Sequence, residues 1–208
     1  MDLARPLSVI SPTLDAEVLR TLAGADADFT TAQVHRVIAH ASLRGIANTL
    51  TRLVDQGIVN RRAVGRAWLY ALNREHLAAP HVIALSQQRA ELISRIASHM
   101  LAWHVPAVFG AIFGSALRAD HTAASDIDLF VVRPDEHDEL LWNVQVEQLA
   151  RRVTSWTGND ARILEMDCAQ VLERGSREPV LQSILAEGIP VAGDHTWLAT
   201  ALTGVQRQ

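Results

Sequence analysis

Short apolar runs alternate with longer amphipathic stretches in the second half of the chain. The runs are long enough for buried strands and too short for typical helices. The expected strands are residues 107–113, 127–132 and 161–166. Apolar residues at helical spacing predict helices at 140–156, 171–174 and 180–186. A last short extended piece follows at 188–191. The order predicts a mixed α/β (α+β) domain.

In the first half, apolar residues at helical spacing form three short stretches, centred on Val18, Val34 and Leu50. Each stretch follows a residue that suits a helix start, and Gly24 and Gly57 suit two of the ends. The helix starts are Ser11-Pro12, Thr30-Thr31 and Ser42. Two short strands, 58–62 and 67–72, then surround Gly65 as in a hairpin. From Pro80 to Leu101 we expect one long amphipathic connector helix.

Composition limits the function classes. With 208 residues, of which 49% are hydrophobic, the chain can bury a substantial core, and its net charge of −4 excludes a generally basic nucleic-acid coat. The sequence contains no lysine, so a phosphate-binding cation must be arginine or a metal ion. The single cysteine, Cys168, excludes an internal disulfide and a Cys-based zinc site. Without a signal-like or membrane-length apolar segment, we expect a cytoplasmic protein without membrane contact.

The order of three short helices and a hairpin over residues 11–75 resembles the winged-helix repressors of the MarR and ArsR kinds. The resemblance implies that the third helix enters the major groove of double-stranded DNA while the wing lies on the backbone, and it implies a homodimer. A local excess of arginine supplies the positive charge that such contacts need. These candidate DNA-binding residues are Arg44, Arg52, Arg61, Arg62 and Arg66. The alternative is a wing used only for dimerisation or packing.

Two carboxylates interrupt the apolar run at 127–132. Asp126 and Asp128 are separated by one residue, so on a strand their side chains share one face. Two neighbouring acids on a largely apolar strand repel each other and are costly to desolvate. Such a pair persists where a positive group, usually a metal ion, lies between them. Gly114 and Ser115 directly follow the preceding strand.

This Gly-Ser turn, followed after ten residues by Asp-Ile-Asp-Leu, resembles the signature of the polymerase-beta-type nucleotidyltransferases, and most closely the minimal ones. The resemblance covers residues 105–193 and is specific only over 114–129. It implies that Asp126 and Asp128 bind two Mg²⁺ ions and that the turn opens a helix and holds the terminal phosphates of a nucleoside triphosphate. The implied reaction transfers a nucleoside monophosphate to an acceptor and releases pyrophosphate.

Each implied role has a physical reason. Gly114 lets the backbone approach a phosphate, the Ser115 hydroxyl adds a donor, and Arg118 could reach a phosphate. The carboxylates are hard oxygen ligands for Mg²⁺. The resemblance also implies a third carboxylate on a later strand. We favour Glu165, because it interrupts an apolar strand, and Asp160 is its rival.

The sequence therefore predicts a DNA-binding winged helix (1–75), a connector helix (76–104), a nucleotidyltransferase domain (105–193) and a C-terminal tail (194–208). The sequence does not identify the acceptor, and the candidates are a toxin side chain, an RNA 3′ end or a small molecule. The alternative function is a transcription regulator or antitoxin whose nucleotidyltransferase fold only binds nucleotide or a partner protein.

Overall fold

The computed structural model of the chain describes residues 1–118 and 121–203. The chain divides into two compact units, which we describe separately. The N-terminal unit comprises Asp2 and residues 4–89, and the C-terminal unit comprises Met1, Leu3 and residues 90–208. The division therefore falls inside the connector segment that the sequence analysis predicts at 76–104.

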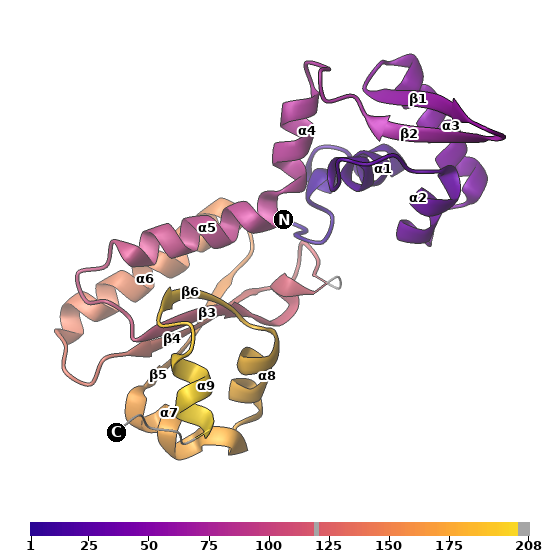
Figure 1. Cartoon of the computed structure of the whole chain (residues 1–208). Coiled ribbons are helices and arrows are strands. Elements are labelled where there is room, and N and C mark those ends of the chain that lie inside the picture. The colour runs from indigo at the N-terminus through magenta and orange to yellow at the C-terminus, as the bar shows by residue number, and fades with distance from the viewer. Residues whose placement is uncertain (119–120, 204–208) are drawn as a thin grey trace. The chain divides into compact units, whose positions relative to one another are not determined.

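The N-terminal unit contains three helices followed by an antiparallel hairpin, in the predicted order (Figure 1). Its elements are η1 (Pro6–Val9), α1 (Leu14–Ala23), α2 (Thr31–Val37), α3 (Leu43–Asp55), β1 (Val59–Val64), β2 (Ala67–Leu72) and α4 (Ala79–Ser86). The identification of this order as a DNA-binding winged helix stays a prediction.

Local sequence explains where these helices begin. The Thr30 hydroxyl accepts a hydrogen bond from Gln33 N, and the Gln33 side chain accepts one from Thr30 N, which forms a capping box for α2. The Ser42 hydroxyl caps α3 by accepting from Gly45 N. The helices bury Val18, Leu22, Val34, Ile46 and Leu50 in one shared core with Tyr70 of the hairpin.

The long helix predicted from Pro80 to Leu101 is two helices. Helix α4 ends at Ser86, and α5 (Gln88–Leu101) begins two residues later. Around this break, the Ser86 hydroxyl donates to Ile83 O and the Gln88 amide donates to Ala84 O. Polar side chains that bond to nearby carbonyls compete with the helical ladder. Apolar periodicity alone does not reveal such a break.

The C-terminal unit is built on a four-stranded mixed sheet. Its order is β5-β4-β3-β6, with β4 and β5 parallel and the other neighbours antiparallel. The strands are β3 (Phe109–Phe113), β4 (Ile127–Arg133), β5 (Ala161–Asp167) and β6 (Ile189–Gly193). The first three lie where the sequence predicts them. The extended piece predicted at 188–191 joins the sheet as β6, beside β3.

Helices cover both faces of this sheet (Figure 1). One face carries Ile127, Leu129 and Val131 and packs against α5 and α6 (Glu139–Thr157). The opposite face carries Phe130 and Val132 and packs against three shorter helices. These are α7 (Cys168–Arg174), α8 (Pro179–Glu187) and α9 (Trp197–Thr203). Neighbouring residues of β4 thus bury their side chains in two different cores, as alternation along a strand requires.

Part of the predicted C-terminal tail is helical. Helix α9 buries Leu198, and Trp197 stacks on Phe109 of β3 at 6.3 Å between ring centroids. Residues 204–208 of the predicted tail lie outside the described residues. Within the described part of the chain, every helix is too short or too polar to cross a membrane.

Candidate active site

Gly114 and Asp128 are in direct contact at the ends of two neighbouring strands. Phe113, the last residue of β3, pairs with Asp128 of β4. Gly114 has a φ of +74°, and a Cβ at this position would lie 2.6 Å from Asp128 Oδ2. Both the left-handed backbone and the close approach require glycine here. The structure thus brings the Gly-Ser turn and the aspartate pair together.

The segment after Gly114 differs from the helix that the resemblance implies. It is a four-residue 3-10 helix, η2 (Gly114–Leu117), in which Arg118 N donates to Ser115 O at 3.0 Å. One turn of this kind has no helical dipole comparable to that of a long helix. Phosphate binding at this turn would depend on close backbone approach and on the Ser115 hydroxyl.

The two aspartates lie on the face of the sheet that carries Phe130 and Val132. Strand alternation places Asp128 on this face. Asp126 lies two positions earlier, just before β4, so the same alternation directs it to the same face. Burial is the main cause that raises the pKa of Asp128, and the Asp126 carboxylate adds to it, against the lowering influence of the Arg162 and Arg118 guanidiniums. The two carboxylates therefore repel each other at a half-buried position.

Arg118 lies at the same end of the sheet. Its guanidinium Nη1 is 3.0 Å from Glu187 Oε1 at the end of α8. Glu187 also accepts a hydrogen bond from Ser183 on that helix. Arg118 is close enough to Asp128 to influence its pKa, so the predicted phosphate-binding arginine is near the aspartates. Its ion pair with Glu187 links it to the end of α8.

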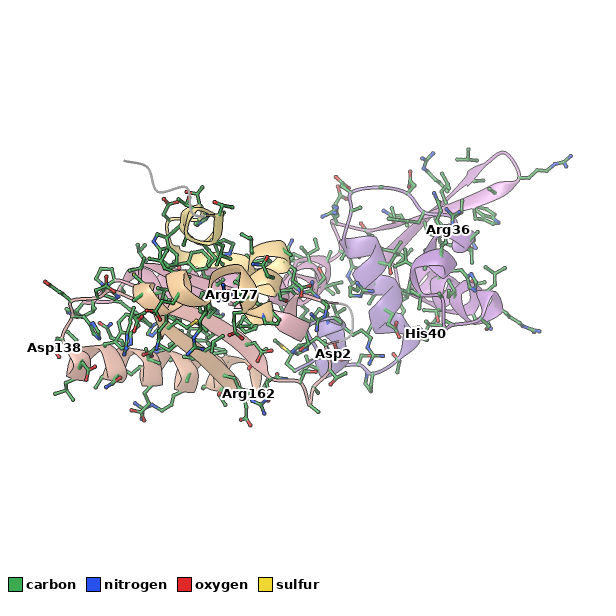
Figure 2. The ribbon with its side chains drawn as sticks, turned by 90° about the horizontal axis from the view of Figure 1, so that it is seen from below. Asp2, Arg36, His40, Asp138, Arg162 and Arg177 are labelled. Atoms are coloured by element: carbon green, nitrogen blue, oxygen red, sulfur yellow. The ribbon has the colours of Figure 1, made fainter. Side chains whose placement is uncertain are left out.

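Arg162, which was not among the residues predicted from the sequence, completes the charged cluster. It pairs with Asp128 in the parallel register of β4 and β5, so both side chains share a face. Its Nη2 atom is 2.9 Å from Asp126 Oδ2, and 72% of its side chain is exposed (Figure 2). A signal was present: Arg162 has the same parity as Leu164 and Met166, so its charge lies on a face that is otherwise apolar.

The structure does not place Glu165 with the aspartates. Glu165 pairs with Val131, which faces α5 and α6, whereas Asp128 faces the opposite side of the sheet. The Glu165 carboxylate instead lies 3.6 Å from the Arg133 guanidinium. Glu165 is three positions after Arg162 on the same strand, and this puts the two on opposite faces. The prediction of Glu165 as a ligand therefore does not fit this fold.

Asp160, the rival third carboxylate, immediately precedes β5. Its backbone carbonyl accepts a hydrogen bond from Ile127 N at 2.8 Å, while its side chain is exposed. Within residues 1–118 and 121–203, no three His, Cys, Asp or Glu side chains are grouped closely enough to hold a metal ion. The structure therefore gives Asp126 and Asp128 no third acidic partner among those residues.

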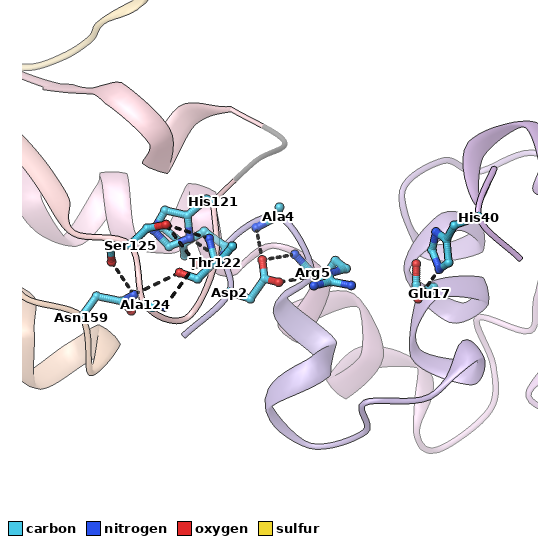
Figure 3. A network of polar contacts seen from close by, with 11 residues as sticks. Asp2, Ala4, Arg5, Glu17, His40, His121, Thr122, Ala124, Ser125 and Asn159 are labelled. Carbon is cyan, nitrogen blue, oxygen red and sulfur yellow. Dashed lines mark hydrogen bonds and ion pairs between the residues drawn. The ribbon is translucent and has the colours of Figure 1, made fainter.

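Asn159 anchors the segment that leads into the aspartate pair. Its side chain is buried, and its amide donates to the carbonyls of Thr122, Ala123 and Ser125, at 3.4, 3.2 and 2.8 Å (Figure 3). Ser125 directly precedes Asp126. One side chain thus ties down the backbone before β4, which positions both carboxylates.

Asp126 and Asp128 suit a hard divalent cation. Carboxylate oxygens are the ligands that Mg²⁺ prefers, and Mg²⁺ is commonly held by one or two carboxylates together with substrate phosphates and water. The Gly114–Asp128 contact leaves no side chain between the turn and the carboxylate, so a phosphate at the turn and a cation at the aspartates would be neighbours. The donor set therefore fits a cation that is shared with a nucleotide.

In the N-terminal unit, the five predicted DNA-binding arginines are not equivalent. Arg52 and Arg62 form ion pairs with Asp15 and Asp28, two acids outside the segment that contains the arginines. The Arg61 guanidinium lies 4.4 Å from the centre of the Trp68 ring. In the part of the chain that the structure describes, Arg44 and Arg66 are exposed and have no ion-pair partner.

A protein-family model matches the segment that holds the two aspartates. Residues 102–187 match the nucleotidyltransferase domain family model. The match includes Gly114, Ser115, Asp126 and Asp128, and it supports nucleotidyltransferase activity. A search among curated proteins found no match to the chain.

Solved structures with some similarity come from toxin–antitoxin systems. A mutant of the toxin–antitoxin MntA-HpeT is 16% identical, with a TM-score of 0.37 over 56% of this chain and 82% of the other. A toxin–antitoxin with AMP-PNP is 19% identical, with a TM-score of 0.37 over 55% and 81%. A tri-AMPylated Shewanella oneidensis HEPN toxin in complex with MNT antitoxin is 16% identical, with a TM-score of 0.38 over 56% and 82%.

Proposed function

We propose that the C-terminal unit transfers a nucleoside monophosphate from a nucleoside triphosphate to an acceptor, in a reaction that depends on Mg²⁺. The observation that carries this proposal is the contact of Asp128 with Gly114, inside the segment that matches the nucleotidyltransferase domain. A phosphate-gripping turn and a cation-binding carboxylate pair are the two parts that such a transfer needs.

The proposed step is an in-line displacement. An acceptor oxygen forms a bond to the α-phosphorus while the bond from that phosphorus to its bridging oxygen breaks. Pyrophosphate leaves with the bonding electron pair, and the acceptor proton passes to solvent. Gly114 and Ser115 would hold the terminal phosphates, Arg118 would contact a phosphate oxygen, and Asp126 and Asp128 would hold the cation. When bound, Mg²⁺ stabilises the negative charge that develops during the displacement.

The acceptor belongs to one of three classes: a side chain of a toxin partner, an RNA 3′ end or a small molecule. Each offers an oxygen nucleophile, and each can be tested in one assay. The full chain is incubated with Mg²⁺ and each of the four nucleoside triphosphates labelled at the α-phosphate, together with a panel of acceptors. We expect label on one acceptor and release of pyrophosphate, both lost in Asp126→Asn and Asp128→Asn. If the label transfer persists in both variants, the proposal is wrong.

A second candidate function is a transcription regulator or antitoxin whose nucleotidyltransferase fold only binds nucleotide or a partner protein. The ion pair between Arg162 and Asp126 favours it, because this pair engages one of the two carboxylates. The same assay separates the two functions. Nucleotide binding that is saturable and depends on Asp128, without pyrophosphate release across the acceptor panel, would identify the regulator.

We further propose that the N-terminal unit binds double-stranded DNA through α3 and the β1–β2 hairpin. Arg44 lies in the first turn of α3, and Arg66 lies in the turn that joins the two strands. Both are exposed, so their charges are available to DNA phosphates. This activity is compatible with either function of the C-terminal unit, since each unit has its own core.

A further inference from the structure

Strand β5 contributes a cation rather than a carboxylate to the candidate active site. Along the face that carries Asp128, the β5 side chains are Arg162, Leu164 and Met166. The acids of this strand, Glu165 and Asp167, have the opposite parity. Both of them interact with Arg133. The acidic positions of β5 are therefore engaged on the other side of the sheet.

The Arg162 guanidinium already neutralises part of the aspartate pair. Its Nη2 atom lies 2.9 Å from Oδ2 of Asp126. The other Asp126 oxygen and the Asp128 carboxylate remain as candidate ligands for a metal ion. Two carboxylates and one guanidinium leave one net negative charge, which a single divalent cation more than balances. Residues 1–118 and 121–203 offer no third acidic group here, so a second divalent cation would lie beside the Arg162 guanidinium without such a ligand from them. Like charges this close in a partly buried site repel each other.

We propose that this site holds one divalent cation and that Arg162 takes the place of a second one. The inference rests on the function proposed above and concerns the same site. Arg162 is a positioning residue: it fixes the orientation of Asp126 and supplies the additional positive charge beside the bound nucleotide. The resemblance implies two Mg²⁺ ions, and the positive charge at position 162 is the reason to expect one.

The number of bound cations tests this proposal without reference to activity. Binding of Mn²⁺ to the full chain is titrated by the loss of the electron paramagnetic resonance signal of free Mn²⁺, with and without α,β-methylene-ATP. We expect one Mn²⁺ per chain in the wild type and in Arg162→Lys, and none at this site in Asp128→Asn. Arg162→Asp, which adds a third carboxylate, should bind two.

A matched control and a second variant keep the test decisive. Arg151 is also an exposed arginine in an ion pair, with Glu147 on α6, so Arg151→Asp makes the same charge change away from the site and should still bind one Mn²⁺. Arg162→Gln should bind one Mn²⁺ at least about threefold more tightly than the wild type, because the nearby positive charge is gone.

The outcomes separate this inference from the proposed function. Two Mn²⁺ ions in the wild type, both lost in Asp128→Asn, would overturn the role of Arg162 and leave the proposed function intact. Unchanged Mn²⁺ binding in both Arg162→Asp and Arg162→Gln would do the same. If the wild type binds no Mn²⁺ at this site, with or without the nucleotide analogue, the proposed function fails as well.

Discussion

Asp128 Oδ2 lies 2.6 Å from the position that a Cβ at residue 114 would take, which is too close for any residue other than glycine. Strand β3 ends one residue before Gly114, and its register with β4 sets this approach. The turn and the carboxylate can therefore contact the same ligand.

Gly114→Ala should lower both stability and activity. The left-handed backbone alone costs about 1–2 kcal/mol for an L-residue, and the new methyl group also displaces the Asp128 carboxylate. Gly158→Ala is a matched control, because Gly158 has a φ of +72° and open space around its Cβ position. Thermal unfolding and nucleotide transfer are measured for both. Equal transfer activity in the two variants would show that the close approach at Gly114 has no role.

Asp128→Asn should abolish transfer and yet stabilise the fold at neutral pH. The folded state raises the pKa of Asp128, mainly through burial, so its ionisation costs stability once the pH exceeds this raised value. The neutral amide avoids that cost. We expect a melting temperature a few degrees above that of the wild type at pH 7, and a difference that vanishes as the pH falls below the ordinary value of 3.8. A variant less stable than the wild type at pH 7 would contradict the repulsion.

Asn159→Ala should loosen the segment before the aspartates. The variant removes the amide that bonds to three carbonyls, and a buried network of this kind contributes about 2–3 kcal/mol. Hydrogen exchange of residues 122–126 should accelerate, and chemical denaturation should show the loss of stability. Asn143→Ala, at an exposed position of α6, should change stability by less than about 0.5 kcal/mol. The anchoring role is wrong if the two variants behave alike.

DNA binding should depend on Arg44 and Arg66 more than on Arg52 and Arg62. Arg52 and Arg62 are held by Asp15 and Asp28, so a phosphate would have to compete with a carboxylate for each of them. In the double variant Arg44→Ala and Arg66→Ala, we expect a shallower slope of the logarithm of the DNA-binding constant against the logarithm of the salt concentration. The slope should fall in magnitude by about 0.9 for each phosphate contact that is lost. The double variant of Arg52 and Arg62 to alanine should change it less. Fluorescence anisotropy with duplex DNA over a range of salt concentrations measures both, and the reverse order would contradict the assignment.

The sequence could predict the meeting of Gly114 with Asp128, because strand alternation and the short separation of two buried strands leave few arrangements. It could not predict which residue of β5 would face the aspartates. That depends on the parallel register, in which a shift of one residue exchanges the faces of Arg162 and Glu165. An acid inside an apolar strand need not be a metal ligand, because Glu165 is paired with Arg133 on the neighbouring strand.

The arginine excess near the hairpin shows a similar limit. Counting charges over residues 42–66 includes Arg52 and Arg62 but leaves out Asp15 and Asp28, which the fold brings beside them from distant parts of the sequence. Local composition describes the charges of a segment and not the surface that it forms. The contacts in the folded unit identify Arg44 and Arg66 as the arginines to test first.

A crystal structure of the full chain with α,β-methylene-ATP and Mn²⁺ would show whether the Gly-Ser turn and the two aspartates share one ligand. We expect the triphosphate at Gly114 and Ser115, and anomalous density for Mn²⁺ between the nucleotide and the carboxylates of Asp126 and Asp128. A nucleotide bound elsewhere on the chain, with neither aspartate in contact with the metal, would contradict the account.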